Sequence, residues 1–473
     1  MKDISKCSGF VVAGFETLAG LLDRFVNNPK YSDNFSIEQI QDFFINTSNR
    51  FLHSYGQNVS EKSYRTSHAK LVNKNLRICR ETKFFDKGLF YVDSGGFQIS
   101  VGLLDEKQTK ALSESYYGFI ERYSESFDRA FILDIVPGPG CKVLKSYDDA
   151  YNYNFKSYET AKKLPENIRD KIIYIHHFRT PILWKIFTEL LNTDGMFDSF
   201  DHFATGGIVA NMRSDIIIPC IIYILPLIPI LYKAKKAGRK EVDFHILGGS
   251  NYRDILFYEL VKKHVYNVHG IKLTVTYDSS GLWKGLQQGR VINIVDDNRC
   301  KKVDLREKWL DLSWCDNNPV FNEPNLSRKE KFLKGINELA SAFNFKKLTS
   351  KEIYDKETKT FYRDVNMYGI LYILWAFSKI EKISKTSSDI AYNHYLDGNI
   401  EEFNKIIDET TKGFNQAKKT KKQKVKSNSF LKSLEVLTSL DIDYCEYIVK
   451  TVLSGDEFTY LTKDNIMKWG DIY

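Results

Sequence analysis

Three aspartates in this 473-residue chain each close a short hydrophobic run that predicts a β-strand, and turn-forming residues follow each of them. They are Asp93, Asp134 and Asp278. If the three strands belong to one closed parallel sheet, their carboxyl ends meet and the carboxylates converge on one pocket. Grouping like charges raises the energy of the folded state, which favours a catalytic role over the alternative, in which each aspartate only caps a turn.

A set of carboxyl groups suits chemistry at a sugar carbon. In retaining glycosidases one carboxylate attacks the anomeric carbon while a second carboxyl group handles the proton of the leaving group. The bond between a sugar and a nucleobase poses the same problem, and a third carboxylate could accept hydrogen bonds from the edge of guanine. After Asp93, the pair Gly95 and Gly96 lets the backbone approach a ligand, and Phe97 offers a flat ring for stacking. The residues alone therefore indicate glycosyl transfer.

Alternating strands and helices are indicated along the middle of the chain. Asp105 with Gln108 predicts one helix start, and Thr180 before Pro181 predicts another. Hydrophobic strands that alternate with helices imply a parallel sheet covered on both faces. We predict an α/β fold, a (β/α)8 barrel, with a doubly wound sheet as the alternative. The runs that suggest strands cover residues 88–96, 129–138, 171–178, 202–207, 243–249 and 273–281.

Composition and charge limit the location and the partners. A net charge of +8 fits a polyanionic partner without requiring one. The seven cysteines are scattered singly, which favours a reducing compartment over a disulfide framework. No signal peptide is evident, and the apolar segment 216–232 contains three prolines and is shorter than the roughly 20 residues that span a bilayer. We expect a cytoplasmic protein without a membrane partner, in which 216–232 is a buried, broken helix.

Between residues 88 and 281 the order of the motifs resembles that of the tRNA-guanine transglycosylases and their DNA-modifying relatives. The string DSGGFQ at 93–98 is the signature of that family, and TYDSS at 276–280 is similar to its later aspartate motif. The resemblance implies a TIM barrel in which Asp278 is the covalent nucleophile and Asp93 is the general acid/base.

The same resemblance implies a set of base-binding residues. The runs FILDIVPGPG, ATGGIV and HILGGS are similar to family segments that surround the base. Where the family usually has a glutamine, this chain has His176 and His177; either histidine could replace the amide, or both could be ordinary polar residues at a strand end. The implied base-binding residues are Ser94, Phe97, Gln98, Asp134, His176, Gly206, Gly207, Ile208, Leu247 and Gly248.

The chain departs from the family at its structural zinc site. The family binds zinc through three closely spaced cysteines and a later histidine, whereas the corresponding region here keeps only Cys315 within 314–321 and has no histidine at 365–367. A structural zinc ion needs four ligands, so we expect no metal and no cofactor. The sequence is therefore most similar to the zinc-less DNA-guanine transglycosylases of phages and bacterial DNA-modification clusters.

We accordingly expect exchange of guanine for a 7-deazaguanine base, such as 7-cyano-7-deazaguanine, in DNA, by a protein that a phage could encode and that acts in the host cytoplasm. The same exchange on tRNA is one alternative, and a non-catalytic nucleic-acid-binding subunit is another. A homodimer and partner modification enzymes are both compatible with this interpretation.

The expected organisation has three parts. Residues 1–410 form the barrel, with the degenerate zinc region near 300–370, residues 411–429 form a lysine-rich linker, and residues 430–473 form a small helical C-terminal segment. A basic rim is expected to hold the nucleic-acid backbone. Its residues are Lys301, Lys302, Lys418, Lys419, Lys421 and Lys422.

Overall fold

Eight parallel strands form one closed barrel in the computed structural model. The strands are β1 (Phe10–Ala13), β2 (Arg50–Ser54), β3 (Leu89–Asp93), β4 (Arg129–Phe131), β5 (Ile172–His177), β6 (His202–Gly206), β7 (Glu241–Ile246) and β8 (Lys272–Asp278). Strand β8 pairs with β1, which places Tyr277 beside Phe10 and Asp278 beside Val11 and closes the sheet. The closed sheet confirms the predicted (β/α)8 TIM barrel and excludes the doubly wound alternative.

The structure describes most of the barrel and the helices that follow it. The described residues are 9–14, 18, 22, 36–56, 66–81, 85, 88–137, 141–178, 180–206, 223–249, 252–278, 290–296, 299–304, 328–349, 361–414 and 428–454.

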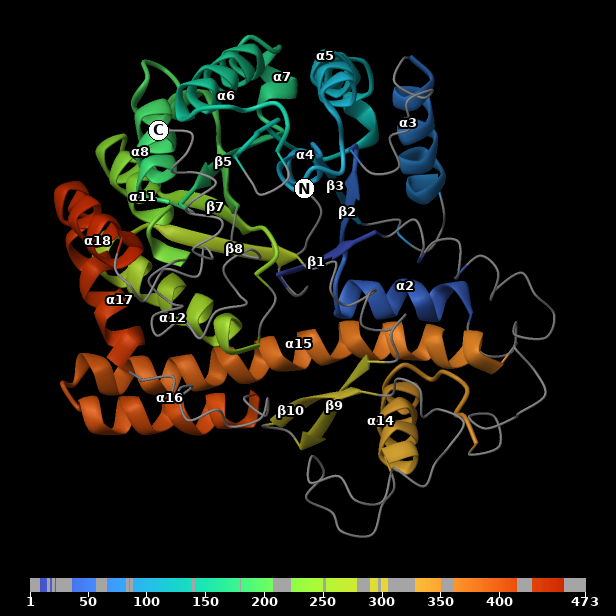
Figure 1. Cartoon of the computed structure of the whole chain (residues 1–473). Helices are drawn as coiled ribbons and strands as arrows, with labels where there is room; N and C mark the ends of the chain where they lie inside the picture. The colour runs from blue at the N-terminus through green and yellow to red at the C-terminus, as the bar shows by residue number, and fades with distance from the viewer. Residues whose placement is uncertain are drawn as a thin grey trace.

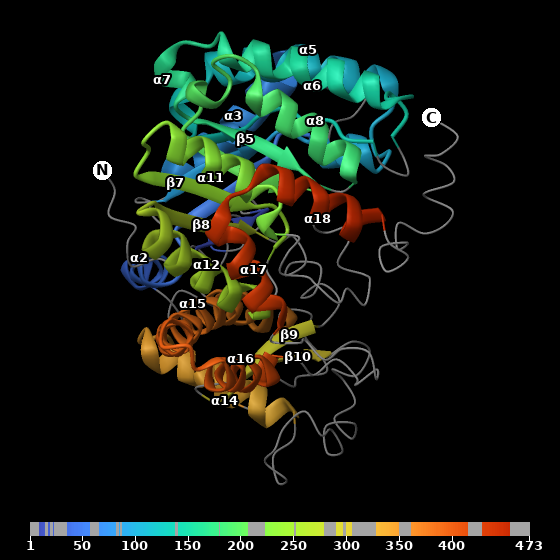
Figure 2. The ribbon, with the colours of Figure 1, turned by 90° about the vertical axis from the view of Figure 1, so that its left-hand side faces the viewer.

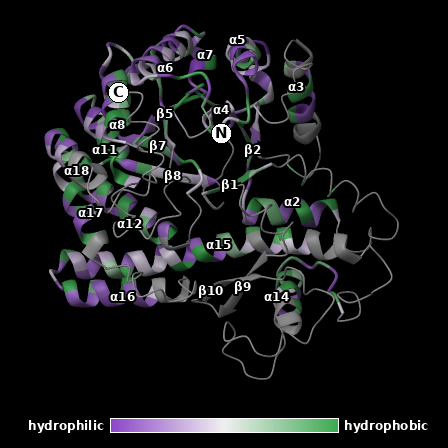
Figure 3. Cartoon of the chain, viewed as in Figure 1, coloured by the Kyte–Doolittle hydropathy of each residue, from purple (hydrophilic) through white to green (hydrophobic). Residues whose placement is uncertain are grey.

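Helices wrap the outside of the barrel between consecutive strands (Figure 1). Both predicted helix starts are present: Asp105 and Gln108 form a capping box at α5 (Glu106–Arg122), and the Thr180 hydroxyl accepts from the Leu183 amide at α8 (Pro181–Asn192). The barrel strands are rich in hydrophobic residues, whereas α6 (Tyr147–Lys162) carries many hydrophilic ones (Figure 3). The remaining helices of this layer are α2 (Ile37–Asn46), α3 (Thr66–Glu81), α4 (Gly96–Ser100), α7 (Glu166–Arg169), α11 (Leu227–Lys236) and α12 (Tyr252–His269).

The apolar segment 216–232 is described only from Tyr223 onward. Pro226 immediately precedes α11, and the first turns of this helix are buried against the barrel. This half of the segment is therefore a buried helix that starts after a proline, and the rest lies outside the described residues. No helix in the described parts of the chain is both long enough and apolar enough to cross a membrane.

A second layer of helices and a hairpin lies below the barrel in both ribbon views (Figures 1 and 2). Its longest element is α15 (Phe361–Leu396), where Phe377 stacks on Phe10 of β1 with ring centroids 4.3 Å apart. The Glu381 carboxylate of the same helix accepts a hydrogen bond of 2.7 Å from the Gly9 amide. Helix α15 thus covers the seam where the barrel closes. The other elements of this layer are α16 (Ile400–Phe414), α14 (Arg328–Ala342), β9 (Arg290–Asp296) and β10 (Arg299–Asp304).

Two helices near the C-terminus return to the barrel. Helices α17 (Asn428–Ser439) and α18 (Ile442–Ser454) pack on α12 and on α8, respectively. His264 of α12 contacts Thr438 of α17 through a hydrogen bond of 3.0 Å. The barrel therefore carries the additional C-terminal helices that the sequence predicts, and they are packed against it.

Candidate active site

The three strand-end aspartates lie together at the carboxyl end of the barrel. Asp93 ends β3, Asp278 ends β8, and Asp134 follows β4. Burial, together with the charges of Asp134 and Asp278, raises the pKa of Asp93 to about 6, against hydrogen bonds from Ser54 and the Gly95 backbone that lower it. The carboxyl ends of parallel strands meet at one rim of the closed barrel, and the three carboxyl groups there lie close enough to repel one another. The structure therefore brings the predicted acids into a single cluster.

A residue of β2 fixes the Asp93 side chain by a hydrogen bond. The Ser54 hydroxyl donates to its Oδ2 at 2.7 Å, and the Gln98 amide donates in turn to the Ser54 oxygen at 3.2 Å. Gln98, predicted to bind the base, therefore reaches Asp93 through Ser54. The sequence interpretation did not include Ser54, because residues 50–54 were not among the predicted strands.

The glycines after Asp93 are needed for the close approach of three backbones. Gly95 has a φ of +97°, and a side chain there would come within 2.5 Å of the Gly56 Cα. A Cβ on Gly96 would lie 2.1 Å from the backbone oxygen of Asp134. Ser94 is fully buried within this turn, whereas the side chain of Phe97 is 56% exposed. Phe97 is therefore placed to meet a ligand, and Ser94 supports the turn.

His177, and not His176, is the histidine that reaches the acid cluster. The Nε2 of His177 donates to Oδ2 of Asp134, and the ring lies against Gly206, where a Cβ would be 2.4 Å away from it. His176 points to the outside of β5 and bonds Thr188 of α8 at 3.0 Å. Burial, with the neighbouring His177, lowers the pKa of His176 to about 3. His176 was predicted among the base-binding residues, but alternation along the strand turns it toward α8, so the structure does not bring it to the acid cluster.

Asp278 is anchored from β7 and from the turn that follows it. The Gly248 amide donates to Oδ1 of Asp278 at 2.7 Å, and Nε2 of His245 lies 3.3 Å from the same oxygen. Leu247 belongs to the same turn and is partly exposed. Gly207 and Ile208, predicted beside the base, lie outside the described residues. His245 was not recognised in the sequence, where it is a single histidine within a hydrophobic run.

The predicted basic rim is only partly described. Lys301 and Lys302 lie on β10, where they pair with Asn293 and Ile292 of β9 in the second layer and not on the barrel. The lysines at 418, 419, 421 and 422 fall outside the described residues, as does Cys315. Within the described part of the chain, no group of three or more His, Cys, Asp or Glu side chains could hold a metal ion. The absence of zinc stays a prediction.

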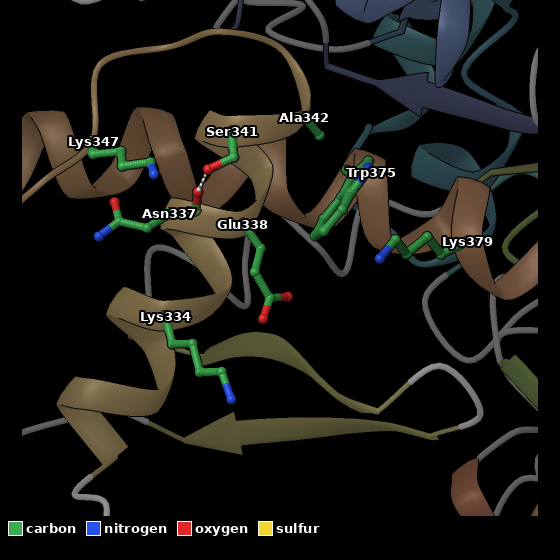
Figure 4. Close-up of a pocket in the computed structure, with 8 residues that line it drawn as sticks. All are labelled: Lys334, Asn337, Glu338, Ser341, Ala342, Lys347, Trp375 and Lys379. Atoms are coloured by element: carbon green, nitrogen blue, oxygen red, sulfur yellow. Dashed lines mark hydrogen bonds between the residues drawn. The ribbon is translucent and has the colours of Figure 1, made fainter.

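A hollow of about 700 Å³ lies between α14, the loop after it and α15 (Figure 4). Lys334, Lys347 and Lys379 line it, with Glu338 as the acidic residue of its wall. The Lys379 amine lies 4.0 Å from the centroid of the Trp375 ring. Because lysines outnumber acids here, this hollow favours an anionic ligand.

No protein-family model, curated protein or solved structure matched the chain in the comparisons. The family resemblance therefore stays a prediction.

Proposed function

We propose that this barrel is a transglycosylase that exchanges guanine for a 7-deazaguanine base in DNA. The observation that carries the proposal is the cluster of three carboxyl groups at the carboxyl end of the barrel, in which the pKa of Asp93 is raised to about 6. Two carboxyl groups placed together at a sugar carbon supply both the nucleophile and the acid/base that displacement there requires.

The proposed reaction has two displacements. The Asp278 carboxylate attacks C1′ of the target nucleotide while the bond from C1′ to guanine breaks, and Asp93 gives a proton to the departing base. A 7-deazaguanine base then attacks the same carbon, loses its proton to Asp93 and releases Asp278. A pKa of about 6 suits both halves, because Asp93 can give and take a proton near neutral pH. The target base must leave its stack to reach Asp278.

Two further features support recognition of a base. Phe97 is exposed at the edge of the cluster and offers a ring for stacking. Asp134 has one carboxylate oxygen bonded by His177, which leaves Oδ1 to accept a hydrogen bond from the edge of the base.

The lysine-lined hollow of the second layer supports a nucleic-acid substrate, because cationic side chains of this kind bind phosphates. DNA and tRNA share this chemistry, so the alternative of the same exchange on tRNA is tested directly. The non-catalytic alternative is disfavoured by the presence of all three acids in one cluster.

To test this, the protein is incubated with DNA and, in parallel, with tRNA, each together with labelled guanine or 7-cyano-7-deazaguanine. Incorporation of the label is measured by nucleoside mass spectrometry. We expect incorporation into DNA by the wild-type protein and none by Asp278→Asn. Incorporation into tRNA alone would replace DNA by tRNA as the substrate. No incorporation into either nucleic acid would overturn the proposed function.

A further inference from the structure

His245 occupies an unusual place for a histidine, in the barrel interior below the carboxylates. It is 2% exposed, and its ring lies edge-on to Phe131 with centroids 5.0 Å apart. Tyr91 lies on another side of the ring, at 6.1 Å between centroids. Both ring nitrogens are used: Nε2 lies 3.3 Å from Oδ1 of Asp278, and Nδ1 lies 2.9 Å from the Thr276 hydroxyl.

These contacts fix which proton the ring carries. An ionised carboxylate can only accept, so Nε2 must be the protonated nitrogen that faces Asp278. In the neutral ring Nδ1 then accepts from the Thr276 hydroxyl, which holds the tautomer. The rings of Phe131 and Tyr91 lie beside the imidazole. His245 is therefore a fixed N–H donor aimed at Asp278.

The two carboxylate oxygens of Asp278 therefore have different hydrogen-bonding environments. Oδ1 receives the Gly248 amide at 2.7 Å and faces His245 Nε2. Among the described residues, no donor forms a hydrogen bond with Oδ2. A carboxylate oxygen without hydrogen bonds is the more reactive of the two, because its lone pairs are not already engaged.

We infer that His245 is a positioning residue that anchors Oδ1 of Asp278 and so makes Oδ2 the attacking oxygen; this inference rests on the proposed function. In the first displacement a bond forms between Oδ2 and C1′, the bond from C1′ to the base breaks, and its electron pair leaves with the base, which takes a proton from Asp93. Oδ1 becomes the carbonyl oxygen of the ester. In the second displacement the electron pair of the ester bond returns to Asp278, and the N–H groups of His245 and Gly248 stabilise the carboxylate as it reforms.

The first experiment measures kcat and KM for base exchange in three variants. His245→Leu removes the donor, His245→Gln keeps an N–H group on a side chain of similar length, and Thr276→Val removes only the hydroxyl that holds the tautomer. We expect kcat to fall on the order of 100-fold in His245→Leu with KM changed less than about threefold, since removal of one preorganised donor has effects of this size. We expect Gln to recover most of the loss and Thr276→Val to lose several-fold.

Full kcat in His245→Leu, or a loss that Gln does not recover, would overturn the inference. Thermal unfolding and circular dichroism check that each variant folds. If His245→Leu does not fold, Thr276→Val decides, and an unchanged kcat in that variant overturns the inference as well.

The second experiment does not depend on activity. Nitrogen NMR of ¹⁵N-histidine-labelled protein reports which ring nitrogen of His245 carries the proton. We expect the Nε2–H form in the wild type and a mixture of tautomers in Asp278→Ala. If the wild type exchanges no base but shows this difference, the proposed function fails while the contact between His245 and Asp278 stands. An Nδ1–H form in the wild type would overturn the inference whatever the activity.

Discussion

Both ends of the barrel hold acidic side chains, but neighbouring groups shift the pKa values of these acids in opposite directions. At the amino end, His202 Nδ1 lies 3.0 Å from the Asp243 carboxylate, and Arg129 contributes a further positive charge. Burial alone would raise the pKa of Asp243, yet the hydrogen bond and charge of His202, together with Arg129, lower it. At the carboxyl end, burial and two further carboxylates raise the pKa of Asp93 to about 6.

This contrast separates a stabilising polar cluster from a candidate reactive one. A lowered carboxyl pKa means that the folded state favours the charge and gains stability from it, whereas a raised pKa means that the folded state resists the charge. The acids at the carboxyl end therefore lower the stability of the folded barrel, as is common for catalytic groups.

The largest effect is expected for Asp278→Asn. The amide cannot form the sugar ester, so base exchange should fall on the order of a thousandfold or more. Intact-mass measurement of the protein after incubation with DNA should find an adduct in the wild type that is absent in the variant. Exchange at the wild-type rate by Asp278→Asn would show that another group is the nucleophile.

Asp93→Asn should separate activity from stability. Loss of the acid/base group should lower kcat on the order of 100-fold or more. Because the folded-state pKa of Asp93 is raised from 3.8 to about 6, this group lowers stability as pH rises through that window, and the deficit persists above it. Replacement by the neutral amide should therefore raise the free energy of unfolding at pH 8 by up to about 3 kcal/mol, at about 1.4 kcal/mol per pKa unit.

Urea unfolding at pH 4 and pH 8 measures this gain, which should be much smaller at pH 4. A variant that is less stable than the wild type at pH 8 would contradict the assigned cause of the raised pKa.

Asp243→Asn is the matched change at the other end of the barrel and should have the reverse pattern. The pKa of Asp243 is lowered, so its contribution to stability is present above the unfolded-state pKa and lost as pH falls through the folded-state value. The variant should lose about 1 kcal/mol of stability at pH 7, as expected for a partly exposed pair, and keep kcat within about twofold. A large loss of activity without loss of stability would break the comparison.

The smallest effect is expected at the lysine-lined hollow. Lys334→Ala with Lys379→Ala should weaken DNA binding and reduce the slope of log affinity against log salt by about 2, if each lysine meets one phosphate. Lys110→Ala with Lys185→Ala, on exposed faces of α5 and α8, removes the same charge elsewhere and is the control. Equal slopes for the two double variants would show that the hollow does not contact the backbone.

Much of the candidate site could be predicted from residue types and their order. Asp93, Asp134 and Asp278 are recognisable because each ends a hydrophobic run, and a closed parallel sheet must bring such ends together. His176 and His177 show where this reasoning stops. Both are buried on β5, one toward a helix and one toward the barrel interior, so hydrophobicity does not tell them apart.

The residues that contact the acids also could not be predicted from the sequence. Ser54 and His245 reach Asp93 and Asp278 from other strands, across 39 and 33 positions of the chain. The residues next to each of them in the sequence are those of an ordinary strand. Only the register between neighbouring strands determines which carboxylate each of them contacts.

The sequence by itself determined the alternation of strands and helices, the positions of the three acids and the glycines between them, because these follow from local periodicity and from backbone conformations that few residues allow. Only the tertiary structure decided which of two adjacent histidines faces the acids, which oxygen of Asp278 is anchored, and which end of the barrel balances its charges. These depend on strand register and on burial shared among distant segments, and no local stretch of sequence specifies either.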